Sequence, residues 1–313
     1  MLHRIISAIF STVLIFSLTS SPSYAYDKPA NDCTSFSGKV NIGSYSMFID
    51  VKGQRQHGLP TVVFENGNGD SQEIWDKVAP EIAKITRVVT YDRIGIGQSD
   101  CPIRSKVDYT AAGEVQRLHT LLKKAKINGP IVFAAHSIGG LYAREYQYLY
   151  PDQVKGIIFI EPSTEYGEKY LFKEFDRKAQ LEIISQDLTY GTGIPIELDT
   201  NDLLNSYNQI LKAQATDPLR NLPIEVLSGS NHHFPAILPN LEARWAGRQA
   251  YIASLSNLSI HRIDANNGHY LHKDNPSFVI NGIKELLTNL KPTKPSKPSK
   301  PSKSSKPFKS TNS

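Results

Sequence analysis

Short runs of β-branched and aromatic residues recur along the chain, separated by longer amphipathic segments. TVVFENG, RVVTYDR and PIVFAAHS fall within residues 61–137, and VKGIIFIEPS, LPIEVLSGS and LSIHRIDANNGH fall within residues 154–269. Apolar strands of this kind, ending at Gly, Asn or Ser and joined through helices, are typical of a parallel sheet covered on both faces. SYSMFIDVKG near residue 50 alternates with period two and predicts an antiparallel strand. We therefore expect an α/β fold with a mostly parallel central sheet.

The strand pattern is interrupted between about residues 162 and 222. EKYLFKEFDRKAQLEIISQDL and DLLNSYNQILKAQA show helical spacing of apolar residues instead. A helical insertion between two strands predicts a lid over the carboxyl ends of the sheet, and its aromatic residues suggest an apolar pocket. The whole of residues 26–290 is expected to be one domain.

The N-terminus has the pattern of a cleaved signal peptide. Arg4 precedes an apolar run from Ile5 to Leu18, which is shorter than the ~20 residues that span a bilayer, and a small-x-small site ends at Ala25. We expect cleavage after Ala25 and an exported protein, periplasmic or extracellular. Export would expose Cys33 and Cys101 to oxidising conditions, and the sequence leaves open whether they pair.

The C-terminal segment, residues 291–313, carries a lysine at every third position from Lys291 to Lys309, with proline and serine between. This composition cannot form a packed core and favours an extended, disordered tail. A second interpretation is an electrostatic contact with an anionic envelope surface.

The tail also accounts for the basic balance of the chain. Without its seven lysines and Arg4, the formal charge of +5 becomes −3 for residues 26–290. A mildly acidic body without a basic, aromatic-interleaved patch gives no indication of nucleic-acid binding.

The stretch VFAAHSIGGLYAREY, residues 132–146, places Ser137 between an apolar strand and a helical segment. An ordinary turn with serine as helix N-cap is one interpretation. The other is a nucleophile elbow, in which a strained serine needs small residues two positions before and after it, here Ala135 and Gly139.

Four motifs in sequence order resemble the α/β-hydrolase superfamily over nearly all of residues 40–290. Besides AHSIG they are VVFENGNGD, which has Asn66-Gly67 in place of the family's His-Gly, YDRIGIGQSD, and NNGHYLHKDNP. The resemblance implies an α/β-hydrolase fold with a helical lid and Ser137 as the nucleophile. It also implies that Asp92 and Arg93 of YDRIGIGQSD support neighbouring loops.

The resemblance selects His269, which follows Gly268, as the base that activates Ser137. His272 is a nearby alternative. The pair His232-His233 could hold a metal only with a third ligand that the sequence does not offer, so we interpret it as lining or solvated. No metal and no cofactor is predicted.

The acid of the triad is less directly indicated. Members of the superfamily usually carry it after the strand that follows the lid, but that loop offers only Ser228, Ser230 and Asn231. Glu161 closes the apolar strand GIIFIEP, where an unpaired carboxylate would be costly, and it keeps the order Ser, acid, His. We predict Glu161, with Asp202, Asp264 and Asp92 as weaker alternatives.

The oxyanion hole is expected from the backbone N–H groups of Asn68 and Ile138, with Gly67 and Gly69 allowing close approach. Together these residues predict an exported serine hydrolase that cleaves a small or medium carboxylic ester. Serine at the elbow argues against dehalogenase or epoxide hydrolase chemistry, which uses a carboxylate there. An amidase or peptidase, a lactonase, a carbon–carbon bond hydrolase, a non-catalytic binding protein and an adhesion role for the tail remain open.

Overall fold

The computed structural model describes residues 35–290 except 57, 190–196 and 235–239. The predicted signal peptide, Cys33 and the lysine-rich tail lie outside the described residues. Cys101 is exposed and forms no disulfide within them. In this part of the chain, none of the helices combines the length and the apolar character of a membrane span.

An eight-stranded sheet forms the centre of the molecule, in the order β1-β2-β4-β3-β5-β6-β7-β8. β2 pairs antiparallel with β1 and β4, and all other pairs are parallel. The strands are β1 (Phe36–Asn41), β2 (Ser46–Lys52), β3 (Thr61–Glu65), β4 (Val88–Tyr91), β5 (Ile131–His136), β6 (Val154–Ile160), β7 (Ile224–Gly229) and β8 (Ser259–Asp264). The predicted mostly parallel sheet is confirmed, whereas β1 was not expected from the sequence.

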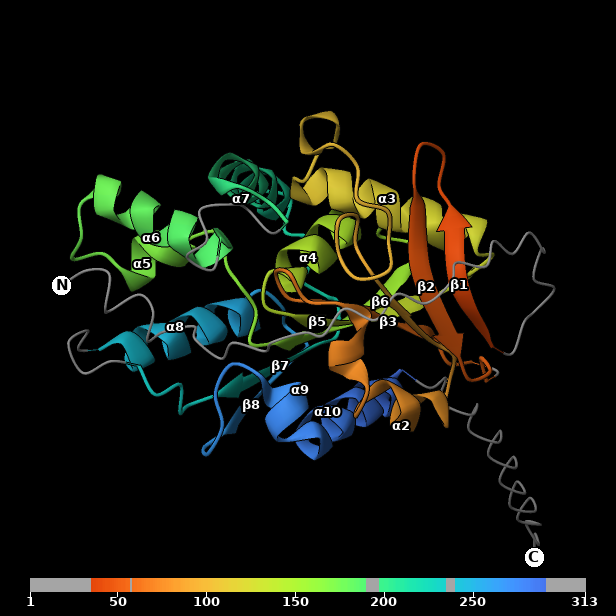
Figure 1. Cartoon of the computed structure of the whole chain (residues 1–313). Coiled ribbons are helices and arrows are strands. Elements are labelled where there is room, and N and C mark those ends of the chain that lie inside the picture. The colour runs from red at the N-terminus through yellow and green to blue at the C-terminus, as the bar shows by residue number, and fades with distance from the viewer. Residues whose placement is uncertain (1–34, 57, 190–196, 235–239, 291–313) are drawn as a thin grey trace, which may run out of the picture.

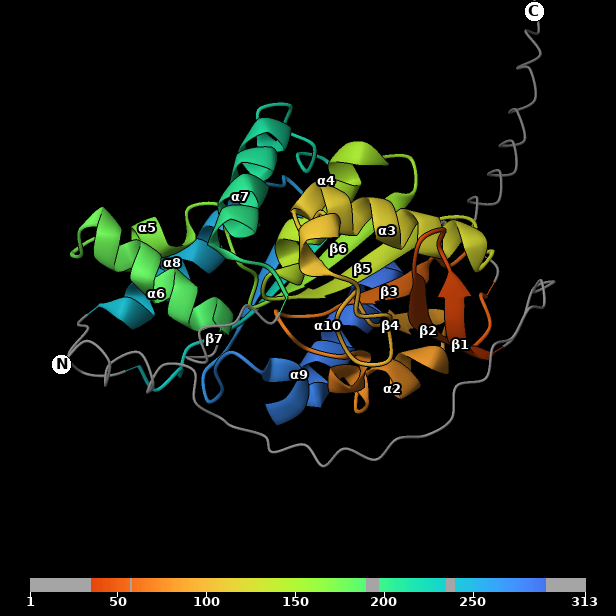
Figure 2. The same ribbon diagram turned by 45° about the horizontal axis from the view of Figure 1, so that its top comes forward.

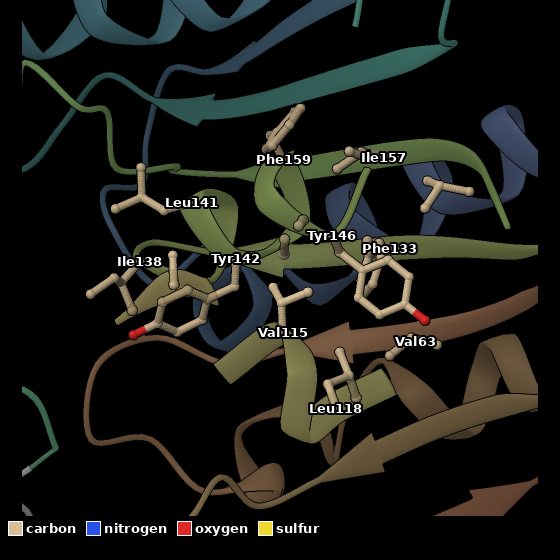
Figure 3. Close-up of a cluster of buried hydrophobic side chains, with 14 of the residues drawn as sticks. Val63, Val115, Leu118, Phe133, Ile138, Leu141, Tyr142, Tyr146, Ile157 and Phe159 are labelled. Atoms are coloured by element: carbon tan, nitrogen blue, oxygen red, sulfur yellow. The ribbon is translucent and has the colours of Figure 1, made fainter. Parts of the chain in front are cut away.

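Successive residues of the central strands point to opposite faces of the sheet, and each face has its own apolar core. In β5, Phe133 and Ala135 belong to one buried cluster, and Val132 and Ala134 belong to the other. Figure 3 shows the first cluster, where Phe133 lies among Ile157 of β6 and the helical side chains of Val115 and Tyr146. This double burial explains why the strands read as continuous apolar runs.

Helices cover both faces of the sheet (Figures 1 and 2). Buried side chains of α3, α4 and α8 belong to the first cluster, and those of α2, α9 and α10 belong to the second. These helices are α2 (Ala79–Ala83), α3 (Ala111–Lys124), α4 (Gly139–Leu149), α8 (Leu241–Ser254), α9 (Leu271–Asp274) and α10 (Pro276–Asn289), with short 3-10 helices at Gln72–Trp75 and Arg104–Lys106.

The segment between β6 and β7 contains α5 (Gly167–Leu171), α6 (Arg177–Thr189) and α7 (Thr200–Gln214). Helical structure in the segment was predicted; its action as a lid stays a prediction. Leu171, Ile183 and Trp245 share a small apolar cluster that joins α5 and α6 to α8. Leu203, Tyr207 and Ile210 of α7 belong instead to the first cluster, together with residues of α3 and α4. The described insertion therefore packs against the domain both through α8 and through α7, which lies beside α4 in Figure 2.

Candidate active site

Ser137 lies in the tight turn between β5 and α4. Its φ of 52° is in the left-handed region, which a non-glycine residue adopts only at a cost of about 1–3 kcal/mol. Its backbone is held on both sides, since its N–H donates to Ile160 (3.1 Å) and its carbonyl accepts from Gly140 (3.0 Å) and Ser163 (2.9 Å). The flanking residues are buried while Ser137 is partly exposed. The N-cap residue of α4 is Ile138, so Ser137 is not a simple N-cap, and its strained strand-turn-helix geometry is the one that a nucleophile elbow requires.

The loop after β3 packs directly against this turn. A Cβ on Gly139 would lie 2.7 Å from the Asn66 carbonyl oxygen and 2.8 Å from Glu65 Cγ. Only glycine therefore lets α4 begin against the segment that contains Asn68. Ile138, the other expected oxyanion donor, is the N-cap residue of α4.

Both polar groups of the Asn66 side chain bond to neighbouring elements of the fold. Its Nδ2 donates to the Tyr91 carbonyl (2.9 Å) and its Oδ1 accepts from Trp75 Nε1 (2.7 Å). The asparagine that replaces the family's histidine thus ties the loop to β4 and to the 3-10 helix below it.

A fully buried arginine shapes the same loop. Arg93 Nη1 donates to the Asn66 carbonyl (2.9 Å) and to Glu65 Oε1 (2.9 Å), and its Nη2 donates to the Gly67 carbonyl. Glu197, from the insertion, accepts from Arg93 Nη2 (2.8 Å) and from the Gly69 N–H (3.0 Å). Arg93 and Glu197 therefore hydrogen-bond to Gly67 and Gly69, the residues on either side of Asn68, and these bonds fix the direction of the Asn68 backbone.

His269 lies in the loop between β8 and α9, next to the elbow. Its carbonyl oxygen is 3.0 Å from Nε2 of His136, the residue before Ser137, and the two rings are 4.7 Å apart between centroids. Its Nδ1 lies 3.5 Å from Glu161 Oε2. The structure thus brings His269 to the end of β5 with its ring nitrogen facing Glu161.

Glu161 follows β6 directly and is completely buried. Its φ of 50° is again left-handed, and its N–H donates to the Leu227 carbonyl (2.9 Å). Oε1 accepts from the Gly229 N–H at 2.6 Å, while Oε2 accepts from Trp245 Nε1 at 2.5 Å and lies 2.8 Å from His232 Nε2. A carboxylate with this many donors stays ionised despite its burial.

The environment separates the titrations of Glu161 and His269. Burial acts to raise the pKa of Glu161, but His232 and His269 outweigh it and lower that pKa to about 2. Burial lowers the pKa of His269 to about 4. At neutral pH the site therefore holds a carboxylate beside a neutral imidazole, the protonation states that a general base requires.

The weaker acid candidates have other partners. Asp264 accepts from the side chains of Asn267 (3.0 Å) and Asn275 (2.6 Å), which fixes the loop that carries His269. Asp202 pairs with Arg104 (2.5 Å) at the start of α7. Asp92 accepts from the N–H groups of Gln72 and Gln98, as expected for a scaffolding residue.

The alternative histidines occupy two different environments. His272 is fully buried against Trp75 and His136, with ring centroids 4.7 and 4.5 Å away, and burial keeps its pKa well below the usual value. The interpretation of His232 as solvated is wrong, because its side chain is 3% exposed and its Nε2 lies 2.8 Å from Glu161 Oε2; the alternative, that it lines the site, stays a prediction. Nothing in the sequence around His232, which is followed by the exposed His233, indicated a contact with Glu161.

Sequence reasoning also missed Trp245 and Glu197. Both are far from the motifs in the chain, and only the packing of α8 and of the insertion brings them to Glu161 and to the loop around Asn68. Within the described residues no group of three or more potential metal ligands converges.

Comparisons with known proteins agree with this architecture. A family model described as the alpha/beta hydrolase fold matches residues 60–282. The chain is 29% identical over 227 residues to the uncharacterized protein YqjL of Bacillus subtilis, covering 70% of this chain and 80% of YqjL. It is 27% identical over 154 residues to a haloalkane dehalogenase of Sphingobium indicum, covering 45% of this chain and 52% of that protein.

Among solved structures, a loop variant of a haloalkane dehalogenase from Bradyrhizobium elkanii matches with a TM-score of 0.58 and 17% identity, over 82% of this chain and 97% of that one. At this identity the similarity concerns the fold alone. The family model spans most of the sheet and both the elbow and the His269 loop. The chain belongs to the α/β hydrolase family.

Proposed function

We propose that this α/β hydrolase is a serine hydrolase that cleaves a small or medium carboxylic ester through an acyl-enzyme. The observation that carries the proposal is the strained Ser137, set against the glycine-rich loop and beside the His269–Glu161 pair. A protein that only binds its ligand gains nothing from such strain.

In this mechanism Ser137 attacks the ester carbonyl while His269 accepts its proton. Glu161 orients His269 through Nδ1 and stabilises the imidazolium that forms. The N–H groups of Asn68 and Ile138 receive the negative charge of the tetrahedral intermediate. His269 then returns the proton to the leaving alcohol as the acyl group stays on Ser137. In the second half, His269 takes a proton from water as its oxygen attacks the acyl carbon, and returns it to Ser137 Oγ as the carboxylic acid leaves.

Ser137 distinguishes the proposed ester hydrolysis from the dehalogenase activity named for one relative. The sequence matches a haloalkane dehalogenase, a chemistry that forms an ester on an elbow carboxylate, whereas Ser137 supplies a hydroxyl. An acyl transfer is therefore favoured over displacement of a halide. Acceptance of amides, lactones or activated carbon–carbon bonds would use the same three side chains.

The test is hydrolysis of p-nitrophenyl esters from acetate to long acyl chains, by the wild-type protein and by Ser137→Ala. We expect turnover that disappears in the variant, and the chain-length optimum would measure the acyl pocket. If neither protein cleaves any ester while amide, lactone or diketone substrates are turned over, the ester assignment is wrong although the triad stands.

We further propose that residues 1–25 direct export and that residues 291–313 contact an anionic envelope surface, both on sequence composition alone. A mature protein that begins at Tyr26 would support export. Deletion of residues 291–313 should release the protein from envelope fractions and leave ester turnover unchanged. An intact N-terminus in the exported fraction, or unchanged fractionation, would contradict the respective proposal.

A further inference from the structure

His232 is held between two carboxylates. Its Nε2 lies 2.8 Å from Glu161 Oε2 and its Nδ1 lies 2.5 Å from Glu242 Oε1, while its backbone N–H donates to Glu242 Oε2 at 3.2 Å. Ionised carboxylates only accept hydrogen bonds, so both ring nitrogens of His232 must carry protons. The ring between them is therefore an imidazolium.

The Glu161 oxygen that binds His232 is the one that His269 needs. Oε2 already receives Trp245 Nε1 at 2.5 Å and His232 Nε2 at 2.8 Å. A carboxylate oxygen has about two acceptor directions. His269 Nδ1 is left at 3.5 Å, beyond hydrogen-bonding range, and is buried without a hydrogen-bond partner among the described residues.

We infer that His232 is a positioning residue that restrains the triad: as an imidazolium it competes with His269 for Glu161 Oε2 and opposes the second positive charge that catalysis requires. The inference rests on the proposed function, since it concerns the step in which His269 takes the proton of Ser137. Loss of the proton removes the positive charge of His232 and leaves one N–H donor for two carboxylates, so it weakens the hold of His232 on Glu161.

The two carboxylates beside His232 both favour its protonated form. Glu161 at the end of β6 and Glu242 on α8 outweigh the cost of burial and raise the pKa of His232 above its usual 6.5. On the loop after β8, His269 is neutral until it receives the proton. Phe234, stacked on the ring at 5.0 Å between centroids, and Trp245 add no charge.

The expected consequence is a rate that rises with pH in two stages. The first stage is the titration of His269, whose pKa is about 4. The second is the loss of the His232 proton, at a pKa above 6.5. At a pH below the second stage, the positive charge of His232 disfavours protonation of His269 and slows the reaction. At a pH above it, His232 is neutral and His269 can bind Glu161 more fully.

The experiment measures the pH profile of Ser137 modification by an organophosphate, and of ester turnover, for three variants. His232→Phe removes the competing donors and keeps an aromatic ring against Phe234. Glu242→Gln removes only the outer carboxylate, which is 40% exposed and pairs with His232 Nδ1 on the side away from Glu161 Oε2. Glu285→Gln is the matched control, an exposed carboxylate paired with Arg262 on another face.

We expect His232→Phe to lose the second stage and to react faster than the wild type below it. Glu242→Gln should shift that stage to lower pH, and Glu285→Gln should follow the wild type. A uniform loss of rate in His232→Phe with the second stage still present, or a Glu242→Gln profile identical to that of the wild type, would overturn the inference.

A second readout does not depend on activity. Histidine-ring NMR titration of the wild type should give His232 a pKa above 6.5, lowered by Glu242→Gln. A His232 pKa at or below 6.5 would overturn the inference even if His232→Phe failed to fold. A wild-type Ser137 that reacts at no pH would instead refute the proposed function.

Discussion

The buried pair of Arg93 and Glu197 gives a prediction that links the insertion to catalysis. Glu197→Ala removes the acceptor of three donors, namely Arg93 Nε, Arg93 Nη2 and the Gly69 N–H. Both side chains are completely buried, so water cannot replace the lost partner. Breaking such a buried pair costs about 3–5 kcal/mol. Arg93 keeps Glu65 and two carbonyl oxygens, which places the cost at the lower end, about 3 kcal/mol.

A domain of this size loses about 2–4 °C of melting temperature per kcal/mol, so Glu197→Ala should melt roughly 6–12 °C lower. Because Arg93 and Glu197 hydrogen-bond to Gly67 and Gly69 on either side of Asn68, the Asn68 N–H, a proposed oxyanion donor, should also lose its alignment. The loss of one such donor typically lowers kcat by about 10²–10³-fold. We expect kcat for a p-nitrophenyl ester to fall about 10²-fold while KM changes little.

The assay is thermal unfolding by circular dichroism together with steady-state kinetics. The matched control is Glu174→Ala, which removes another carboxylate of the insertion whose side chain is 53% exposed and pairs with Arg244. An exposed pair contributes at most about 1 kcal/mol, so this variant should melt within a few degrees of the wild type and keep its kcat. The reasoning is refuted if Glu197→Ala behaves like Glu174→Ala in both measurements.

Three further predictions concern the site itself. Glu161→Gln removes the charge that stabilises the His269 imidazolium, so kcat should fall roughly 10³–10⁴-fold while circular dichroism stays native; near-normal turnover would exclude Glu161 as the acid. The folded-state pKa of Glu161, about 2, lies below its usual 4.5, so its contribution to stability is complete above pH 4.5 and is lost as the pH falls toward 2. Melting temperatures measured against pH should show this loss in the wild type and not in Glu161→Gln. Gly139→Ala would place a Cβ 2.7 Å from the Asn66 carbonyl oxygen and push the expected oxyanion donors Asn68 and Ile138 apart. Ester turnover should therefore fall at least about 10²-fold. A fully active variant would show that this close contact is not needed.

The sequence predicted most of the sheet because burial on both faces leaves a direct trace, as in PIVFAAHS of β5. β1, with the sequence FSGKVN, was missed because it is an edge strand with alternating partial exposure and a glycine, which reads as a loop. Glu161 could be singled out because a carboxylate that closes an apolar strand requires partners. The sequence could not name those partners. His232 and Trp245 reach Glu161 from a loop and from α8, and their contacts arise only from tertiary packing.

Glu197 illustrates the same limit for the insertion. Helical spacing predicted α7 correctly, yet no local pattern indicates that a carboxylate just before that helix pairs with an arginine 104 positions earlier in the chain. The motif YDRIGIGQSD predicted a scaffolding role for Arg93. Its partners could not be predicted, because three of its hydrogen bonds go to residues 65–67, 26–28 positions earlier, and two go to Glu197.

The measurement that tests the central claim most directly is covalent labelling by an organophosphate, located by mass spectrometry. The account predicts a single phosphorylated peptide containing Ser137 in the wild type, no label in Ser137→Ala, and labelling slowed by orders of magnitude in His269→Gln. A wild-type protein that remains unlabelled, or one labelled equally fast without His269, would contradict an activated serine at this elbow.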